Sequence, residues 1–156
     1  MLIKLLSVFG LAMVPLVELR GSVILGCGLG LEWYVTYIVS VLGNLLPVPF
    51  ILLFIRSIFD MMKKWGGKFE KIALFFEEKG TSKSLKVTRY ASLGLFLFVA
   101  IPLPGTGAWM GALIASLLKM RLKHSLISIT LGVICAGLIM SLACYGVISG
   151  LEFLFS

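Results

Sequence analysis

Charged residues are scarce in this chain of 156 residues. They make up 13% of it, against 60% hydrophobic residues, and the mean hydropathy is +1.09. A soluble domain of this length needs a mostly polar surface, which this composition does not supply. The sequence therefore predicts an integral membrane protein that has the lipid bilayer as its surroundings.

Residue types that bind metals or do acid–base chemistry are also few, with seven acidic residues, one histidine and three cysteines. Cys27, Cys135 and Cys144 lie in apolar stretches without CxxC spacing or a nearby histidine, so we predict packing residues and no metal site or disulfide framework. GxSxG, P-loop and zincin motifs are absent, and no second acidic residue lies near Glu18. We expect no enzyme and no cofactor.

Positive charge is concentrated in two places. The net charge is +7, and most Lys and Arg residues lie between positions 56 and 89 or just after position 118. Such clusters beside apolar segments mark the cytoplasmic side of a membrane and do not indicate a nucleic-acid partner.

Two uncharged stretches, residues 33–55 and 126–148, are long enough to span a bilayer. Within the first, Asn44, Pro47 and Pro49 predict a kink or break, because proline removes a helical hydrogen bond and clashes with the preceding turn.

Two further apolar stretches, residues 5–31 and 91–118, are interrupted by polar, turn-rich segments. Each arm of about ten residues would be about 16 Å long as a helix, half of the roughly 30 Å hydrocarbon core. We therefore expect re-entrant hairpins. The alternative, two continuous spans, would place the basic segments 60–90 and 119–123 on opposite sides of the membrane, against the positive-inside tendency.

The predicted fold is an all-α inverted repeat in one membrane domain. Residues 1–59 form a re-entrant hairpin plus a transmembrane helix, residues 60–90 a cytoplasmic amphipathic linker, and residues 91–156 the second repeat. Similar short segments at 39–43 and 128–132, which are 89 positions apart, fit this plan, which is common in secondary transporters. Both termini would lie outside a bacterial inner membrane.

Glu18 and Arg20 are the charged residues that lie well inside apolar sequence. Burying either costs at least about 2.5 kcal/mol on insertion scales, so we expect partners or a water-filled cavity. One hypothesis is that the two residues neutralise each other and fix the hairpin tip. The other is that Arg20 binds a substrate anion while Glu18 exchanges a proton or cation.

The second tip adds to the anion hypothesis. If the returning arms begin at Arg20–Gly21 and at 105–107, two helix N-termini point to the midplane, where their N–H groups suit phosphate or carboxylate. Ser22 and Thr106 are residue types that cap such ends. The predicted substrate-binding residues are Arg20, Gly21, Ser22, Gly105, Thr106, Gly107 and Trp109, with Asn44 as a further candidate. Glu18 is the predicted proton-coupling residue, and Pro15, Pro102 and Pro104 are predicted to shape the tips.

Both tips also carry a family resemblance. Residues 18–22, Glu-Leu-Arg-Gly-Ser, together with residues 100–109, Ala-Ile-Pro-Leu-Pro-Gly-Thr-Gly-Ala-Trp, resemble the small multi-drug export proteins, over nearly the whole chain. The architecture is similar to the DedA and VTT-domain group. That resemblance implies opposed re-entrant hairpins and lipid flipping or scrambling, including undecaprenyl phosphate recycling. The first tip departs from the DedA pattern, which has a longer acidic, proline-rich motif there.

The leading hypothesis is a small transporter or flippase that moves an anionic or amphipathic substrate, with lipid phosphate as one candidate, through a midplane site coupled to protons. One alternative is a multidrug/proton antiporter, as the family name implies. Another is a structural or assembly factor that transports nothing. A homodimer is compatible with the small size of one chain.

Overall fold

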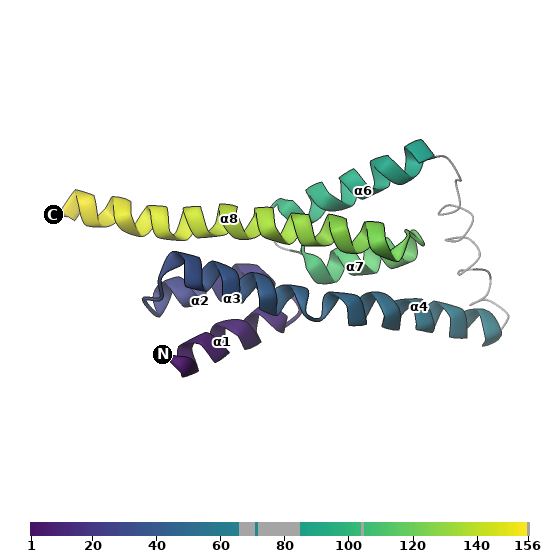
Figure 1. Ribbon diagram of the computed structural model, residues 1–156, viewed down its shortest axis with the longest axis horizontal. Coiled ribbons are helices and arrows are strands. Elements are labelled where there is room, and N and C mark those ends of the chain that lie inside the picture. The colour runs from purple at the N-terminus through teal and green to yellow at the C-terminus, as the bar shows by residue number, and fades with distance from the viewer. Residues whose placement is uncertain (66–70, 72–84, 104, 156) are drawn as a thin grey trace.

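The computed structural model describes residues 1–65, 71, 85–103 and 105–155, and every regular element within them is an α-helix. Most helices run along the long axis of an elongated molecule, with both termini toward one end and the end of α4 and the start of α6 toward the other (Figure 1). Most of the predicted linker helix, and Pro104, lie outside the described residues. The helices are α1 (Leu2–Met13), α2 (Glu18–Gly28), α3 (Trp33–Leu45), α4 (Val48–Trp65), α6 (Leu85–Ala100), α7 (Ala108–Leu117) and α8 (Leu122–Phe155).

Two segments are long and apolar enough to cross a membrane. Trp33–Ile58 and Leu122–Val147 each have 26 residues, with mean hydropathies of 2.4 and 2.3. Both predicted spans are thus confirmed by length and composition, and α8 extends beyond the predicted one to 34 residues. The predicted break is also confirmed, since α3 ends at Leu45 and α4 begins at Val48.

Helices α1 and α2 form one pair, and α6 and α7 form another. Helix α1 packs on α2 and α3, while α6 packs on α7 and α8. The start predicted for the first returning arm, Arg20–Gly21, is wrong, because α2 begins at Glu18. Leu16 and Glu18 have φ values of 78° and 48°, so the chain reverses before Arg20 is reached.

The predicted capping roles are wrong as well. Ser22 lies inside α2, and its hydroxyl donates a hydrogen bond to the carbonyl of Leu19 at 2.9 Å. The residue at the N-cap of α7 is Gly107, and no side chain at that position caps the helix. Thr106 lies one residue earlier, and its hydroxyl oxygen is close to the carbonyls of Ile101 and Leu103, at 2.8 and 2.9 Å.

Backbone features recur 89 positions apart. Leu16 and Gly105 have left-handed φ values of 78° and 82°, and Gly30 and Lys119 have 68° and 47°. Backbone hydrogen bonds at the ends of α2 and α7 follow the same spacing. At the end of α2 the amides of Leu29, Gly30 and Leu31 donate to the carbonyls of Leu25, Cys27 and Gly26, respectively. At the end of α7 the amides of Leu118, Lys119 and Met120 donate to the carbonyls of Ile114, Ser116 and Ala115. Each hairpin therefore ends in a turn of the same geometry.

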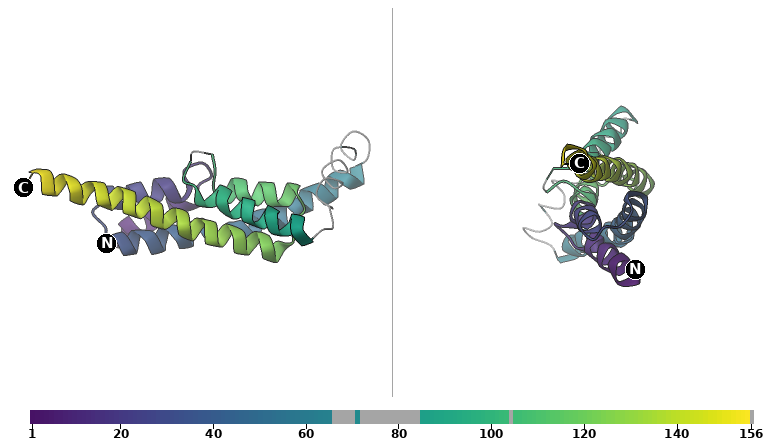
Figure 2. Two further views of the ribbon diagram at one scale, coloured as in Figure 1. Left: turned by 90° about the horizontal axis from the view of Figure 1, so that it is seen from above. Right: turned by 90° about the vertical axis from the view of Figure 1, so that its left-hand side faces the viewer.

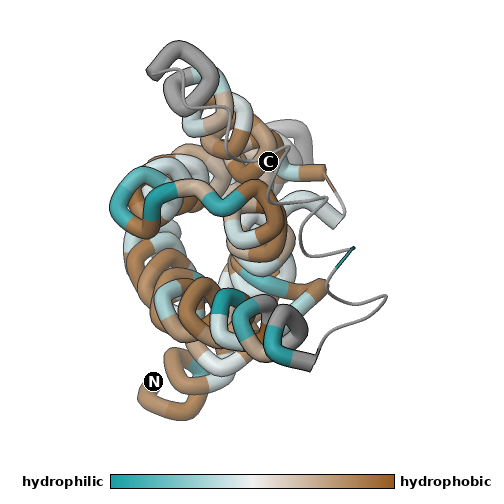
Figure 3. The backbone as a smooth tube through the Cα atoms, turned by 90° about the vertical axis from the view of Figure 1, so that its right-hand side faces the viewer, coloured by the Kyte–Doolittle hydropathy of each residue, from teal (hydrophilic) through white to brown (hydrophobic). Residues whose placement is uncertain are grey.

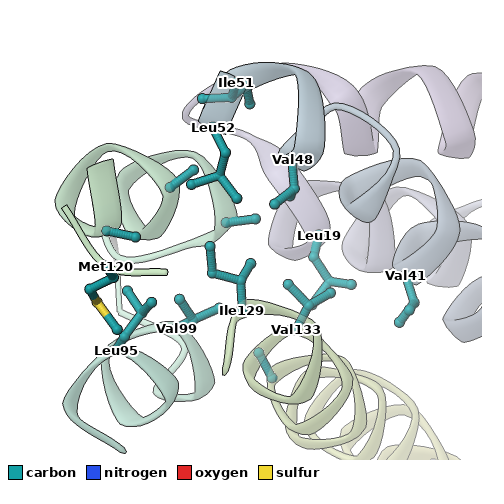
Figure 4. Packing of buried hydrophobic residues seen from close by; sticks show 14 of the residues in the cluster. Leu19, Val41, Val48, Ile51, Leu52, Leu95, Val99, Met120, Ile129 and Val133 are labelled. Atoms are coloured by element: carbon teal, nitrogen blue, oxygen red, sulfur yellow. The ribbon is translucent and has the colours of Figure 1, made fainter. Parts of the chain in front are cut away.

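A shared core joins the two pairs. Leu19, Val48 and Leu52 from the first half meet Val99 and Ile129 from the second (Figure 4). Apolar burial does not drive helix association within lipid, so close packing of small residues matters more there.

Within each half, a glycine brings two helices close together. A Cβ placed on Gly43 of α3 would lie 2.7 Å from the carbonyl oxygen of Phe9 in α1, and one on Gly132 of α8 would lie 3.0 Å from the carbonyl oxygen of Phe96 in α6. These two glycines are again 89 positions apart.

Two basic segments lie at the same end of the molecule. A guanidinium nitrogen of Arg56 in α4 donates a hydrogen bond to the carbonyl of Met120, in the turn between α7 and α8. Figure 3 views the molecule from this end, with hydrophilic segments in teal beside mostly apolar helices. The end of α4 and the basic turn that contains Arg121 thus lie toward the same end of the molecule.

Candidate functional site

The two hairpin turns meet near the middle of the molecule. The α1–α2 and α6–α7 connections lie side by side (Figure 2). Nη2 of Arg20 donates to Oγ1 of Thr106 at 2.8 Å and lies 3.3 Å from the carbonyl oxygen of Ile101. In the other direction, the amide of Trp109 donates to Oε1 of Glu18 at 3.0 Å. Each tip thus donates a hydrogen bond to the other.

Glu18 occupies the N-terminus of α7. Its side chain is 4% exposed, and its carboxylate accepts a backbone hydrogen bond in the first turn of a helix from the other half. A negative charge there is favoured by the free N–H groups and the helix dipole. The position that sequence reasoning assigned to a substrate anion is thus taken by a carboxylate of the chain itself.

Gly107 makes room for that carboxylate. A Cβ at this position would lie 1.6 Å from Oε2 of Glu18, a distance that two atoms without a bond between them cannot adopt. The φ of Gly107 is 179°, an extended backbone that any residue adopts, so glycine is needed here for space. Glu18 and Gly107 are themselves 89 positions apart, so equivalent points of the two hairpins touch.

Arg20 has unused hydrogen-bonding capacity. Its Nη1 lies 3.5 Å from Oε2 of Glu18, a long ion pair, while Nη2 makes the contacts across to the second tip. Nε of Arg20 is buried without a hydrogen-bond partner among the described residues, and so is Nε1 of Trp109. Buried donors of this kind are normally satisfied, so two of them on residues that line the same cavity indicate a place for an acceptor.

A cavity of about 340 Å³ lies beside these donors. Leu16 and Phe54, two of its lining residues, are 91% and 68% exposed, so the cavity opens sideways at the outer surface of the helices. Its lining residues are Pro15, Leu16, Glu18, Arg20, Ile51, Phe54, Ile55, Gly105, Trp109, Met110 and Leu113. The lining side chains with polar atoms are those of Glu18, Arg20 and Trp109, and the others are apolar.

The predicted site residues divide into three groups. Those that line the cavity are Pro15, Glu18, Arg20, Gly105 and Trp109, and those beside it in the contact between tips are Thr106 and Gly107. Those that the cavity does not include are Gly21, Ser22, Asn44 and Pro102.

Sequence reasoning missed the apolar wall. Ile51, Phe54 and Ile55 come from one face of α4, and Met110 and Leu113 come from α7. The helical spacing of residues 51, 54 and 55 was the available signal, but it reads equally well as a lipid-facing surface.

The helices and the site define a helical membrane protein with a lateral apolar cavity and a charged pair at its polar end. Comparison with known families gives a match to "Putative small multi-drug export protein" over residues 18–139, which begins at Glu18 and includes Arg20 and the whole second tip. The match covers well over half of the chain, and the chain belongs to this family. Comparison with curated proteins gives no match, and comparison with solved structures gives none.

Membership supports two coarser predictions. A family of export proteins and two long apolar helices indicate a membrane location. The family description is that of an exporter and not of an enzyme.

Proposed function

We propose that this chain is a small membrane transporter, of flippase type, that moves an amphipathic substrate with an anionic head group past the meeting point of the two tips. Lipid phosphates and other phosphate- or carboxylate-bearing amphiphiles share this chemistry.

The observation that carries the proposal is the pair of buried donors without partners, Nε of Arg20 and Nε1 of Trp109. A phosphate or carboxylate accepts hydrogen bonds from both groups and gains the charge of the guanidinium. Glu18, by contrast, already accepts a hydrogen bond from the amide of Trp109 at the end of α7. The site therefore offers free donors to an anion more readily than it offers a free carboxylate to a cation.

The cavity accounts for the amphipathic part of the substrate. Ile51, Phe54 and Leu113 supply an apolar wall, and the cavity opens at the side of the molecule. A substrate whose tail stays in the bilayer can place its head at Arg20 without crossing the aqueous phase.

The proposed membrane arrangement has both hairpins re-entrant and the two halves, 1–59 and 91–156, in opposite orientation around the linker 60–90. Support comes from the features that recur 89 positions apart and from the lengths of α1, α2 and α7, which have 12, 11 and 10 residues. Helices of that length reach about 15–18 Å, half of the hydrocarbon core. Because the end that carries Arg56 and Arg121 is basic, it lies in the cytoplasm and both termini lie outside.

Coupling to protons follows from the position of Glu18. An incoming anion at Arg20 is repelled by the carboxylate of Glu18, whose Oε2 lies 3.5 Å from Nη1 of Arg20. Protonation of Glu18 removes this repulsion and weakens its hold on α7. Substrate and proton would then enter the site together.

A second candidate is a multidrug/proton antiporter, which the family description favours. In this case Glu18 would bind a cationic drug in exchange for a proton. The amide of Trp109 and the guanidinium of Arg20 would then have to release the carboxylate.

Transport in proteoliposomes separates these possibilities. The probes are two fluorescent amphiphiles with the same tail, one with a phosphate head and one with a quaternary ammonium head. We expect the wild type and the exposed-charge control Arg121→Gln to move the phosphate probe, and Arg20→Gln to lose this activity while remaining folded.

Movement of the ammonium probe alone, lost in Glu18→Gln, would replace the proposal by the antiporter. Movement of neither probe would overturn it in favour of a structural or assembly role.

A further inference from the structure

A line of polar side chains lies buried where α2 and α3 pack against α8, outside the residues that line the cavity. All are at most 3% exposed and come from α2, α3 and α8. We call them the polar lane: Ser22, Thr36, Ser40, Asn44 and Ser141.

Three atoms of the polar lane are buried without a hydrogen-bond partner among the described residues: Oγ of Ser40, Oδ1 of Asn44 and Oγ of Ser141. Each such group costs about 1–3 kcal/mol when it is left unsatisfied. Buried polar groups in proteins are bound either to other protein groups or to ordered water. Three in one region therefore indicate a place that holds water.

Helix packing brings these groups to neighbouring levels. Helices α2 and α3 run in opposite directions, and the Cα of Gly26 faces the side chain of Thr36 closely enough that a Cβ there would lie 2.3 Å from it. One turn further along, Ser22 comes level with Ser40, and at the next turn Glu18 comes level with Asn44.

Helix α8 joins the lane from its other side. The hydroxyl of Tyr145 is 2.8 Å from Oγ1 of Thr36 and donates to the carbonyl of Leu31 at 2.7 Å. Ser141 precedes Tyr145 by four residues and so lies on the same face, one turn closer to Glu18. The lane thus extends from Tyr145, near the α2–α3 turn, to the helical level of Glu18.

Two positions of the lane have apolar equivalents in the second half. The residues 89 positions after Ser40 and Asn44 are Ile129 and Val133, which are 0% and 1% exposed in the apolar core, whereas the residue equivalent to Thr36 is Ser125, which is also buried. At positions 40 and 44, unsatisfied polar side chains therefore stand where the other half has apolar ones. Packing alone does not call for polar residues here.

We propose that the polar lane holds a chain of water molecules that carries protons between Glu18 and the end of the molecule that bears both termini. This inference rests on the proposed proton exchange at Glu18 and specifies the side from which the proton comes. Tyr145 stands at the outer end of the lane, where movement of its hydroxyl from Leu31 would open it.

Several charged or titratable groups lie along this route in the described part of the chain. Arg20 and the amide of Trp109 contact Glu18 itself. The other titratable side chains along the lane are Cys27 in α2, Tyr37 in α3, and Cys144 and Tyr145 in α8. None of these four side chains lies between the level of Asn44 and the level of Glu18 along the helices. In this proposal Glu18 is therefore the group that accepts the proton at the inner end of the lane.

Thiol labelling tests the water chain without any substrate or transport. In a background with Cys27, Cys135 and Cys144 changed to Ala, single variants Ser40→Cys and Ile129→Cys are treated in sealed proteoliposomes with a small charged methanethiosulfonate reagent on the side of the termini. The two positions are both 0% exposed and serve as a matched pair. We expect Ser40→Cys to react at least about tenfold faster, because a buried thiol in dry apolar surroundings is inert.

Asn44→Cys against Val133→Cys gives a second matched pair if either first variant does not fold. Equal rates within both pairs, or no reaction at Ser40→Cys and Asn44→Cys, would overturn the proposal. If the lane positions react faster in a protein that moves neither amphiphile, the water chain is supported and the proposed transport is refuted. The labelling and transport results therefore test the two proposals separately.

A functional readout completes the test. Asn44→Val introduces the residue that the second half carries at position 133, so it should fold with no loss of thermal stability. We expect it to slow proton-driven movement of the phosphate probe at least about tenfold while probe binding is unchanged, since a break in a proton route affects rate and not affinity. An unchanged rate of proton-driven movement would overturn the role of the lane.

Discussion

Gly107→Ala should detach Glu18 from α7. The added methyl would lie 1.6 Å from Oε2 of Glu18 and 2.5 Å from its Cδ, so the carboxylate must leave. The backbone of residue 107 is extended and accepts alanine, so strain adds nothing to the effect. Loss of a charge-assisted hydrogen bond costs about 1.5–3 kcal/mol, and loss of the helix-dipole interaction up to about 1 kcal/mol more. We therefore expect a decrease of about 2–4 kcal/mol in the free energy of unfolding, measured by equilibrium unfolding in mixed detergent micelles.

A double-mutant cycle isolates this cause. In the Glu18→Ala background the methyl of Gly107→Ala has no carboxylate to displace, so the same substitution should cost less than about 1 kcal/mol. Gly28→Ala is the control for adding a methyl, because no neighbour in the described part of the chain lies within 4 Å of its Cβ position. Equal costs of Gly107→Ala with and without Glu18 would refute the idea that Gly107 exists to admit this carboxylate.

Three further outcomes follow from the fold and the site. Cysteines at the exposed positions Asp60 and Arg121 should react with an impermeant reagent from the same side of the membrane, and reaction from opposite sides would exclude a re-entrant second hairpin. Gly43→Ala and Gly132→Ala should each lower the free energy of unfolding by about 1–3 kcal/mol through a close helix contact, and a large cost at one position only would contradict equivalent packing in the two halves. Glu18→Gln should bind substrate but lose the dependence of transport on pH, and a pH profile like that of the wild type would place the coupling group elsewhere.

Much of the fold follows from local patterns. The break between α3 and α4 is readable from Asn44 and Pro47, because proline restricts the backbone wherever it occurs. The two long apolar segments are readable from length and hydropathy alone. The position of the basic turn at Arg121 at the same end as Arg56 follows from charge distribution.

The site depends on contacts that local patterns do not encode. Glu18 and the amide of Trp109 are 91 residues apart, and nothing near Glu18 in sequence shows that it will cap α7. The start of α2 was misplaced because Leu16 has a left-handed φ, a conformation that sequence reasoning reserves for glycine. Ser22 was taken for a cap for the same reason, since the helix had already begun when the chain reached it.

Binding of an anionic amphiphile tests the central claim most directly. Native mass spectrometry of the purified protein, with the phosphate-headed and ammonium-headed probes at equal concentration, compares the wild type, Arg20→Gln and Arg121→Gln. We expect one phosphate-headed molecule to bind to each wild-type and Arg121→Gln chain, and affinity to fall about 10–100-fold in Arg20→Gln, the factor for losing about 1.5–3 kcal/mol of charge-assisted hydrogen bonding. Binding of the ammonium-headed probe in preference, or binding of the phosphate-headed probe that does not depend on Arg20, would contradict the account.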